Sequence, residues 1–204
     1  MSKAKQPTLI IFAGANGSGK TTVAKLLLPK RRIKEFVNAD EIARGLSPLN
    51  PTGQAVAAGR LVLKRTKELI AKRESFAIET TLSGNTLLQN IVLAQKAGYE
   101  VEMHYIFCAD INVNIQRVKT RVKQGGHDVP ASDIRRRYWR SLRNYVRIFH
   151  EKCDKIAIYD TTAGALVEIA DKDHRAHYVV FDDGLFHRFT MKLIEALDDE
   201  RRDI

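Results

Sequence analysis

Residues 14–21 read GANGSGKT and directly follow the apolar run Thr8–Ala13, TLIIFA. That run is short, β-branched and aromatic, which is typical of a buried strand, and a glycine ends it. The glycine-rich stretch matches the pattern G-x-x-x-x-G-K-[ST], in which glycines let successive backbone N–H groups converge on phosphate oxygens. The pattern, placed between a strand and a helix, predicts a phosphate-binding loop (P-loop).

Each position of this loop has an expected role. Lys20 reaches the β- and γ-phosphates, the Thr21 hydroxyl ligates Mg²⁺, and the helix that opens at Lys20 directs its positive end towards the anion. We therefore expect ATP or GTP, with Mg²⁺, as the cofactors. The expected nucleotide-binding residues of the loop are Gly14, Ala15, Asn16, Gly17, Ser18, Gly19, Lys20, Thr21 and Thr22.

Strands and helices alternate beyond the loop. Apolar runs predict strands over Glu35–Asn38, Phe76–Thr80, Glu100–Cys108 and Lys155–Tyr159. Helical spacing and turn residues predict helices over Thr21–Leu28 (stopping before Pro29), Thr52–Arg73, Asn85–Lys96 (capped by Ser83), Val113–Lys123 and Ser132–Glu151. This alternation is typical of an α/β fold, a P-loop kinase-like parallel sheet flanked by helices.

The C-terminal part reads differently. Two apolar runs, Ala165–Ala170 and His177–Phe181, flank a charged turn and predict an antiparallel hairpin, followed by a last helix over Leu185–Leu197. No repeat or linker interrupts the 204 residues. We therefore expect one domain over residues 1–204.

Composition sets the expected environment. The formal charge is +10, which attracts polyanions, and no apolar run approaches membrane-spanning length. The two cysteines, Cys108 and Cys153, are not closely spaced, as expected for thiols in a reducing cytosol. We expect a cytoplasmic protein with no membrane partner.

A P-loop alone leaves the fate of the γ-phosphate open. A GTPase switch needs Asn-Lys-x-Asp, which this sequence lacks, and a motor is normally longer. Instead, FVNAD and FAIET place Asp40 and Glu79 at the ends of two strands. Ligands of open parallel sheets bind there, so both carboxylates should face the γ-phosphate, where they can accept a hydroxyl proton and help hold Mg²⁺. A simpler role for Asp40, compatible with the first, is to cap the helix beginning at Glu41.

Basic residues gather in the second half of the chain. Between Arg117 and Arg147 lie ten basic residues and two acidic ones. Arg117 and Arg121 share a helix face, GGHDVP (125–130) forms a loop, and Arg135–Arg137 open the next helix. This arrangement predicts an arginine lid over the phosphates, roughly residues 117–140, with Arg117 as a further nucleotide contact. The alternative roles for these basic residues are a solvated helix face, structural ion pairs, or a surface that binds the phosphates of a nucleic acid.

Several stretches taken together resemble the zeta-toxin family of P-loop kinases. The matching stretches, within residues 8–160, are GANGSGKTT, FVNADEIA, FAIETTLSG, RVKTRVKQGGHDVP and IRRRYWRSLRNY. Members of that family phosphorylate a sugar hydroxyl of UDP-N-acetylglucosamine with ATP or GTP, and a small antitoxin occludes the nucleotide site of toxic members. The resemblance thus implies a small-molecule acceptor of the sugar-nucleotide class and a small antitoxin as a candidate protein partner.

The resemblance also implies roles for individual residues. Asp40 would be the base, assisted by Lys20, with Arg121 and one or more of Arg135–Arg137, Arg136 among them, as lid arginines. The implied substrate contacts are Asn38, Glu79, Thr81 and His127.

The sequence departs from the family in two respects. It has Ser83 where plasmid-type toxins place an arginine that helps bind the sugar nucleotide, and its 204 residues are fewer than theirs, from which we expect a compact, chromosomal kind of member without their long C-terminal extension. Other readings stay open at this point: a kinase of another metabolite or antibiotic, a nucleic-acid end-phosphorylating protein, or a nucleotide-binding module controlled by a partner. Against nucleic acid, the basic helix has no stacking run of aromatic residues, since the core takes up part of Tyr138, Trp139 and Tyr145.

Overall fold

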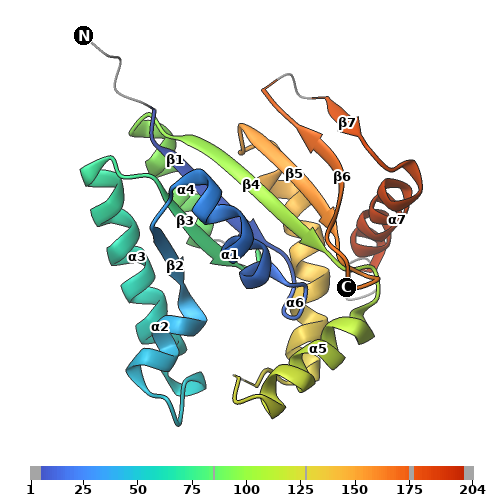
Figure 1. The fold of residues 1–204 in the computed structure, drawn as a ribbon, viewed down its shortest axis with the longest axis horizontal. Coiled ribbons are helices and arrows are strands. Elements are labelled where there is room, and N and C mark those ends of the chain that lie inside the picture. The colour runs from blue at the N-terminus through green and yellow to red at the C-terminus, as the bar shows by residue number, and fades with distance from the viewer. Residues whose placement is uncertain (1–5, 85, 127, 175–176, 200–204) are drawn as a thin grey trace.

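A computed structural model describes residues 6–84, 86–126, 128–174 and 177–199. Its centre is a seven-stranded sheet in the order β2-β3-β1-β4-β5-β6-β7, drawn in Figure 1. The strands are β1 (Thr8–Ala13), β2 (Glu35–Asn38), β3 (Phe76–Thr80), β4 (Glu100–Phe107), β5 (Lys155–Asp160), β6 (Val167–Lys172) and β7 (Tyr178–Val180). The five predicted strands of the parallel part are therefore present, within one residue of their expected ends.

The C-terminal hairpin is confirmed and has a further role. β6 pairs antiparallel with β7, as predicted, and also antiparallel with β5. The hairpin thus continues the central sheet, which makes it a mixed sheet with a parallel core. Ile169 and Ala170 of β6 are fully buried, so this extension adds apolar surface to the main core.

The helices follow the expected order with some different ends. They are α1 (Lys20–Arg31), α2 (Ala39–Leu46), α3 (Ala55–Lys72), α4 (Thr86–Lys96), α5 (Ile111–Lys123), α6 (Ala131–Asn144) and α7 (Asp183–Asp199). A short 3₁₀ turn, Thr52–Gln54, precedes α3, and a π-helical turn, Tyr145–Phe149, follows α6. The long helix expected to run to Glu151 is therefore α6 with an irregular end.

The prediction that the first helix stops before Pro29 is wrong. α1 continues through Pro29 to Arg31 and ends at Arg32, whose left-handed backbone N–H bonds to Leu28 O and Pro29 O. A proline so near the end of a helix removes only one donor from the backbone ladder, so the helix can run past it.

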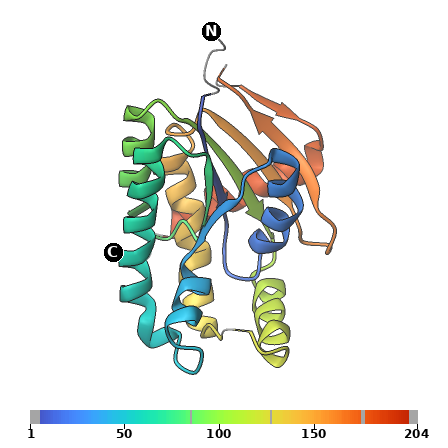
Figure 2. The same ribbon diagram turned by 60° about the vertical axis from the view of Figure 1, so that its left-hand side comes forward.

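Helices cover both faces of the sheet (Figure 2). On one face, α3, α4, α6 and α7 bury the larger core, to which Leu69, Ile91, Leu142 and Phe189 contribute. On the other face α1 packs Val23, Ala24 and Leu28 against strand residues such as Phe12. Within the described residues, no helix combines the length and apolarity needed to cross a membrane.

One buried carboxylate lies beside α1. Glu102 of β4 is 5% exposed, and its Oε1 accepts hydrogen bonds from His104 Nε2 at 2.9 Å and from Arg31. Burial raises the pKa of Glu102, but the hydrogen bond and charge of His104, with the charge of Arg31, outweigh burial and hold the pKa below its ordinary value. The charged form of Glu102 is therefore stabilised by the fold.

Because of Glu102, the free energy of unfolding should depend on pH in the acidic range. Because its pKa is lower in the folded state, its contribution is present above the unfolded value of about 4.3 and is lost as the pH falls through the folded value. We expect Glu102→Gln to lower the free energy of unfolding at pH 7 by ~1–2 kcal/mol, at the low end for charged hydrogen bonds because Arg31 is half exposed. Urea denaturation at neutral pH and near pH 3.5 measures this.

The loss should shrink at the acidic pH, which lies below the unfolded pKa of about 4.3, because there the unfolded chain binds a proton and part of the stabilisation by the charged Glu102 is already lost. Glu151→Gln, at a carboxylate whose side chain is 76% exposed, is the control and should change little at either pH. A Glu102→Gln loss of the same size at both values would contradict the charge-based account.

Candidate functional site

The strand register gathers polar residues at one edge of the sheet. Asn38 at the end of β2 pairs with Glu79 of β3, and Glu79 pairs with Phe12 of β1. Ala13, the last residue of β1, leads into the P-loop. The carboxyl ends of three neighbouring parallel strands therefore meet beside the loop, where ligands of such sheets bind.

The P-loop backbone requires glycine at defined points. Gly17 has φ 81°, and a Cβ there would lie 2.3 Å from the Asn114 carbonyl oxygen of α5. Gly19 has φ 97° and is the N-cap residue of α1, so no side chain there bonds to the first N–H groups of the helix. The space where a Cβ of residue 19 would project is open. The first N–H groups of α1 are thus left for a ligand, which is the geometry of a phosphate site.

Lys20 and Thr21 both contact Glu79. Lys20 is buried, with 5% of the residue exposed. Its ammonium group donates to the Ala15 carbonyl at 2.8 Å and lies 3.9 Å from Glu79 Oε1. Burial lowers the pKa of Lys20, while the charges of Glu79 and Asp40 act in the opposite direction. The Thr21 hydroxyl donates to Glu79 Oε2 at 2.7 Å. The contacts of Glu79 therefore lie on the P-loop side of the site, and the substrate contact that the family resemblance implies for it stays a prediction.

Asp40 does not cap its helix. α2 begins at Ala39, and the N-cap is Asn38, whose Oδ1 accepts from Asp40 N at 2.9 Å and Glu41 N at 3.3 Å. The simpler role considered for Asp40 is therefore wrong, because its neighbour fills it. The Asn38 amide also donates to Glu79 Oε2 at 2.9 Å, so Asn38 orders two elements of the site.

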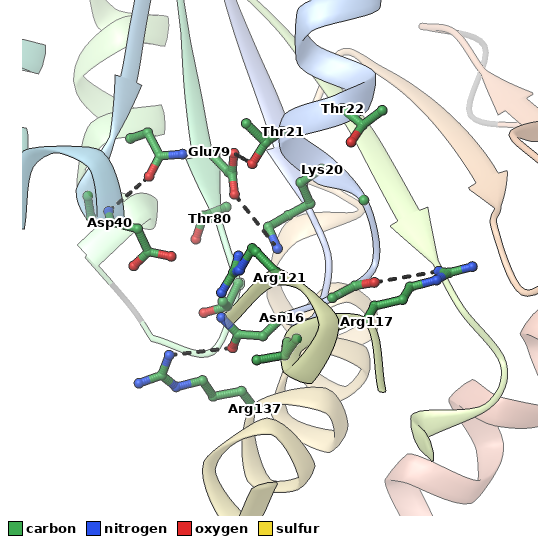
Figure 3. Close-up of a pocket in the computed structure, with 16 residues that line it drawn as sticks. Asn16, Lys20, Thr21, Thr22, Asp40, Glu79, Thr80, Arg117, Arg121 and Arg137 are labelled. Atoms are coloured by element: carbon green, nitrogen blue, oxygen red, sulfur yellow. Dashed lines mark hydrogen bonds and ion pairs between the residues drawn. The ribbon is translucent and has the colours of Figure 1, made fainter. Parts of the chain in front are cut away.

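These residues line a cavity of about 450 Å³, shown in Figure 3. Lys20 and Glu79 lie on one side, Asp40 on another, and Arg121 and Arg137 come from α5 and α6. Of the predicted site residues, the cavity is lined by Asn16, Gly17, Gly19, Lys20, Thr21, Thr22, Asn38, Asp40, Glu79, Thr81, Arg117 and Arg121. Gly14, Ala15 and Ser18 belong to the buried backbone of the loop and do not line it. His127 lies outside the described residues.

The structure places a different lid arginine at the cavity. Arg136 points away, with its side chain 55% exposed and its guanidinium 2.9 Å from Asp133 Oδ1. Arg137 instead lines the cavity and donates to Asn16 Oδ1 at 3.4 Å. Successive helix residues are rotated by ~100°, so only the packing of α6 decides which of the adjacent arginines faces inward.

A second cavity of about 310 Å³ adjoins the P-loop on the far side of Arg117. It is lined by Ser18, Gly19, Thr22, Val23, Leu26, Arg117, Thr161, Gly164 and Leu166. Gly19, Thr22 and Arg117 line both cavities, so the two spaces meet along the start of α1. Ser18, Gly19, Thr22 and Arg117 were predicted as nucleotide contacts, whereas Thr161 and Gly164, which follow β5, carry no motif that the sequence analysis could recognise.

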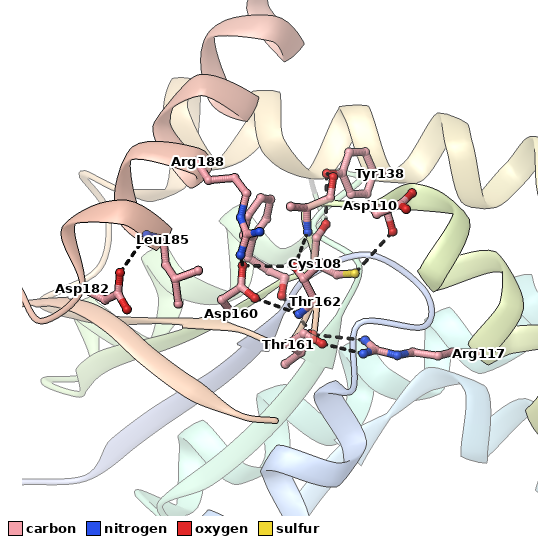
Figure 4. A network of polar contacts seen from close by, with 12 residues as sticks. Cys108, Asp110, Arg117, Tyr138, Asp160, Thr161, Thr162, Asp182, Leu185 and Arg188 are labelled. Atoms are coloured by element: carbon pink, nitrogen blue, oxygen red, sulfur yellow. Dashed lines mark hydrogen bonds and ion pairs between the residues drawn. The ribbon is translucent and has the colours of Figure 1, made fainter. Parts of the chain in front are cut away.

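Thr161 holds Arg117 between the cavities (Figure 4). Its hydroxyl oxygen lies 3.0 Å from the carbonyl oxygens of both Ser18 and Phe107, which share its single proton, and it accepts from Arg117 Nη1 at 3.2 Å. The second Arg117 nitrogen donates to the Thr161 carbonyl. The neighbouring Asp160 is 3% exposed and lies 3.3 Å from Arg188 of α7. Asp160 at the end of β5 and Thr161 directly after it therefore tie the P-loop, α5 and α7 together.

Comparison with known proteins identifies the family. A family model described as an AAA domain matches residues 9–144, and the chain therefore belongs to this AAA-domain family. An uncharacterised protein of Haemophilus influenzae is 32% identical over 133 residues, which cover 65% of this chain and 94% of that protein. A P-loop domain of this kind implies ATP binding.

Solved structures share the fold at low identity. Chains of the AvrRxo1-ORF1:AvrRxo1-ORF2 complex match with TM-scores of 0.76 for the structure with sulphate ions and 0.73 for the one with ATP. Both are 18% identical over 93% of this chain, which spans only 65% of their length. A chain of the PezAT chromosomal toxin–antitoxin system of Streptococcus pneumoniae matches with a TM-score of 0.65 at 18% identity, covering 95% of this chain and 88% of that one. The likeness is one of fold, the P-loop kinase-like α/β fold.

Proposed function

We propose that this chain transfers the γ-phosphoryl group of ATP or GTP to a hydroxyl group of a small acceptor, with UDP-N-acetylglucosamine as the favoured acceptor. The observation that carries this proposal is a single cavity lined by Lys20, Asp40, Arg121 and Arg137. A cation at the P-loop, a carboxylate facing it and arginines from two further helices are the components that in-line phosphoryl transfer requires.

We infer a nucleotide position along the P-loop. Its phosphates would lie against the N-terminus of α1, and its base in the cavity beside Val23, Leu26 and Leu166, whose apolar side chains suit a planar ring. Arg117, held by Thr161, would separate the base from the phosphates. The ATP in one AvrRxo1-ORF1:AvrRxo1-ORF2 structure supports a nucleotide on this fold.

Mg²⁺ fits the donors that are present. Thr21 and Glu79 offer hard oxygen atoms next to the phosphate position, and the described residues contain no cluster of three His, Cys, Asp or Glu that would form a separate metal cage. Thr21, with Glu79, would therefore hold the ion, which neutralises charge on the β- and γ-phosphates when bound.

Asp40 is the proposed base. The acceptor oxygen forms a bond to the γ-phosphorus while the bond from that phosphorus to the β–γ bridging oxygen breaks, and the hydroxyl proton passes to the Asp40 carboxylate. Lys20, Arg121 and Arg137 stabilise negative charge on the transferring group and on the departing diphosphate. Thr81, which also lines the cavity, is the proposed acceptor contact.

The basic helix gives little support to a nucleic-acid function. Arg136 and Arg137 both lie near Asp133, and Arg135 donates to Asn112. Tyr138 is buried, and Trp139 packs against Lys192 and the core, so neither presents an open stacking surface. Control by an antitoxin stays a prediction of the family resemblance. The matched PezAT chain comes from a system described as a toxin–antitoxin system, which supports this prediction.

The test is a coupled assay of nucleotide turnover with and without UDP-N-acetylglucosamine. We expect acceptor-dependent ADP or GDP release and a product heavier by one phosphoryl group in mass spectrometry. Turnover with another small hydroxyl compound instead would retain the kinase and replace the acceptor. Phosphorylation of a 5′-hydroxyl oligonucleotide in preference to every small acceptor would overturn the proposal.

A further inference from the structure

The turn after β3 contains an unusual backbone. Leu82 has φ 58° and is fully buried. The other described non-glycine residues with positive φ are Arg32 and Arg73, both exposed residues that end helices, where this conformation is common. Leu82 does not end a helix, so this explanation does not apply to its positive φ, and its surroundings must impose the conformation.

Three contacts hold this turn. The Leu82 N–H donates to Thr80 Oγ1 at 3.0 Å, and the Leu82 carbonyl accepts from Asn144 Nδ2 at 2.7 Å. The hydroxyls of Thr81 and Ser83 lie 2.8 Å apart. The Asn144 contact is the one that comes from outside the turn, since Asn144 is the last residue of α6.

The turn determines what the cavity presents to an acceptor. Thr80 and Thr81 line the cavity, while Leu82 and Asn144 do not. Arg137 reaches the same cavity from α6, one residue before Tyr138, whose hydroxyl donates to the Cys108 carbonyl at the end of β4. The same helix therefore fixes a lid arginine and the loop that carries the two threonines.

We propose that Asn144 is a positioning residue for the acceptor. By holding the Leu82 carbonyl, its amide keeps the strained turn in place and sets Thr80 and Thr81 to receive a hydroxylic acceptor, at a fixed distance from Arg137. This inference rests on the proposed function for its kinetic consequence. Asn144 touches neither the nucleotide cavity nor the P-loop in the described contacts, so the nucleotide half of the site should be independent of it.

The experiment compares Asn144→Ala and Asn144→Asp with Ser141→Ala. Asn144→Ala removes the donor, and Asn144→Asp removes it at nearly unchanged shape. We expect KM for UDP-N-acetylglucosamine to rise ~3- to 10-fold, with KM for ATP within ~2-fold of wild type, because the loss is that of one hydrogen bond acting on ground-state binding. Ser141→Ala, one turn earlier in α6, removes a buried contact with Tyr105 (3.0 Å) remote from the turn and should leave both constants unchanged.

Hydrogen exchange of the segment 80–84 supplies a second measurement. Exchange at the Leu82 amide should be at least ~5-fold faster in Asn144→Ala and unchanged in Ser141→Ala. If Asn144→Ala does not fold, Asn144→Asp gives the same comparison. Equal increases in both KM values, or an acceptor KM unaffected by faster exchange, would overturn the positioning role.

The two proposals fail in different ways. If the wild-type protein transfers phosphate to no sugar nucleotide, the favoured acceptor is overturned. The role of Asn144 in holding the turn is then tested by hydrogen exchange at the Leu82 amide alone. In that case, faster exchange at Leu82 in both Asn144 variants supports the clamp, and unchanged exchange overturns it.

Discussion

Replacement of Asp40 by asparagine is expected to lower kcat by ~10²- to 10⁴-fold, the usual contribution of a general base, with little change in ATP affinity. Asparagine keeps the size of the side chain but cannot accept the hydroxyl proton. The backbone around Asp40 should stay in place, because the α2 cap belongs to Asn38. Steady-state transfer rates, with calorimetric titration of ATP, separate the two effects.

The control for this variant is the next residue. Glu41→Gln alters the same helical turn, but the Glu41 side chain is 58% exposed and pairs with Arg44 at 3.7 Å. It should keep kcat within ~2-fold, as surface changes generally do. Equal losses of ATP affinity and transfer in Asp40→Asn would show that Asp40 acts on the metal ion and not as the base.

The second large effect is expected at the lid. Arg137→Ala should lower kcat by ~10²- to 10³-fold, because a preorganised cation at the transferring group is lost. Arg137→Lys should recover only part of the rate, since an ammonium on a flexible stem does not reproduce the guanidinium fork. Single-turnover transfer rates at saturating nucleotide measure this loss without a contribution from product release.

The adjacent arginine provides a matched control. Arg136→Ala removes the same charge from the same helix, but the Arg136 side chain is directed to Asp133 and to solvent. It should leave kcat nearly unchanged. A larger loss in Arg136→Ala than in Arg137→Ala would mean that α6 has a different rotation in the working enzyme.

The sequence was sufficient to predict which residues of the P-loop and of the neighbouring strand ends line the cavity. The spacing of Gly14, Gly19 and Lys20 defines the P-loop, and the alternation of elements brings Asp40 and Glu79 to the same edge of a parallel sheet. These predictions depend on local patterns and on a general rule for where such sheets bind ligands. The fold class followed from the same alternation and is confirmed.

Features that depend on packing were not predictable in the same way. The choice between Arg136 and Arg137 depends on how Tyr138 and Leu142 seat α6 against the sheet. The turn at Leu82 carries no glycine to signal a positive φ, because a contact from Asn144 imposes it. The contact of Thr161 with the P-loop depends on the pairing of β5 with β4, because this pairing brings the Thr161 hydroxyl to the Ser18 carbonyl.

The register of the central strand has a consequence for how the chain folds. Leu9 of β1 pairs with Phe76 of β3, and Thr8 pairs with Glu100 of β4, so β1 gains both neighbours only from distant parts of the chain. During synthesis, β1 must wait until about half of the protein has left the ribosome before it can be enclosed on both sides. The P-loop follows β1 directly, so its backbone geometry is a late product of folding, although its residues are among the first to be made.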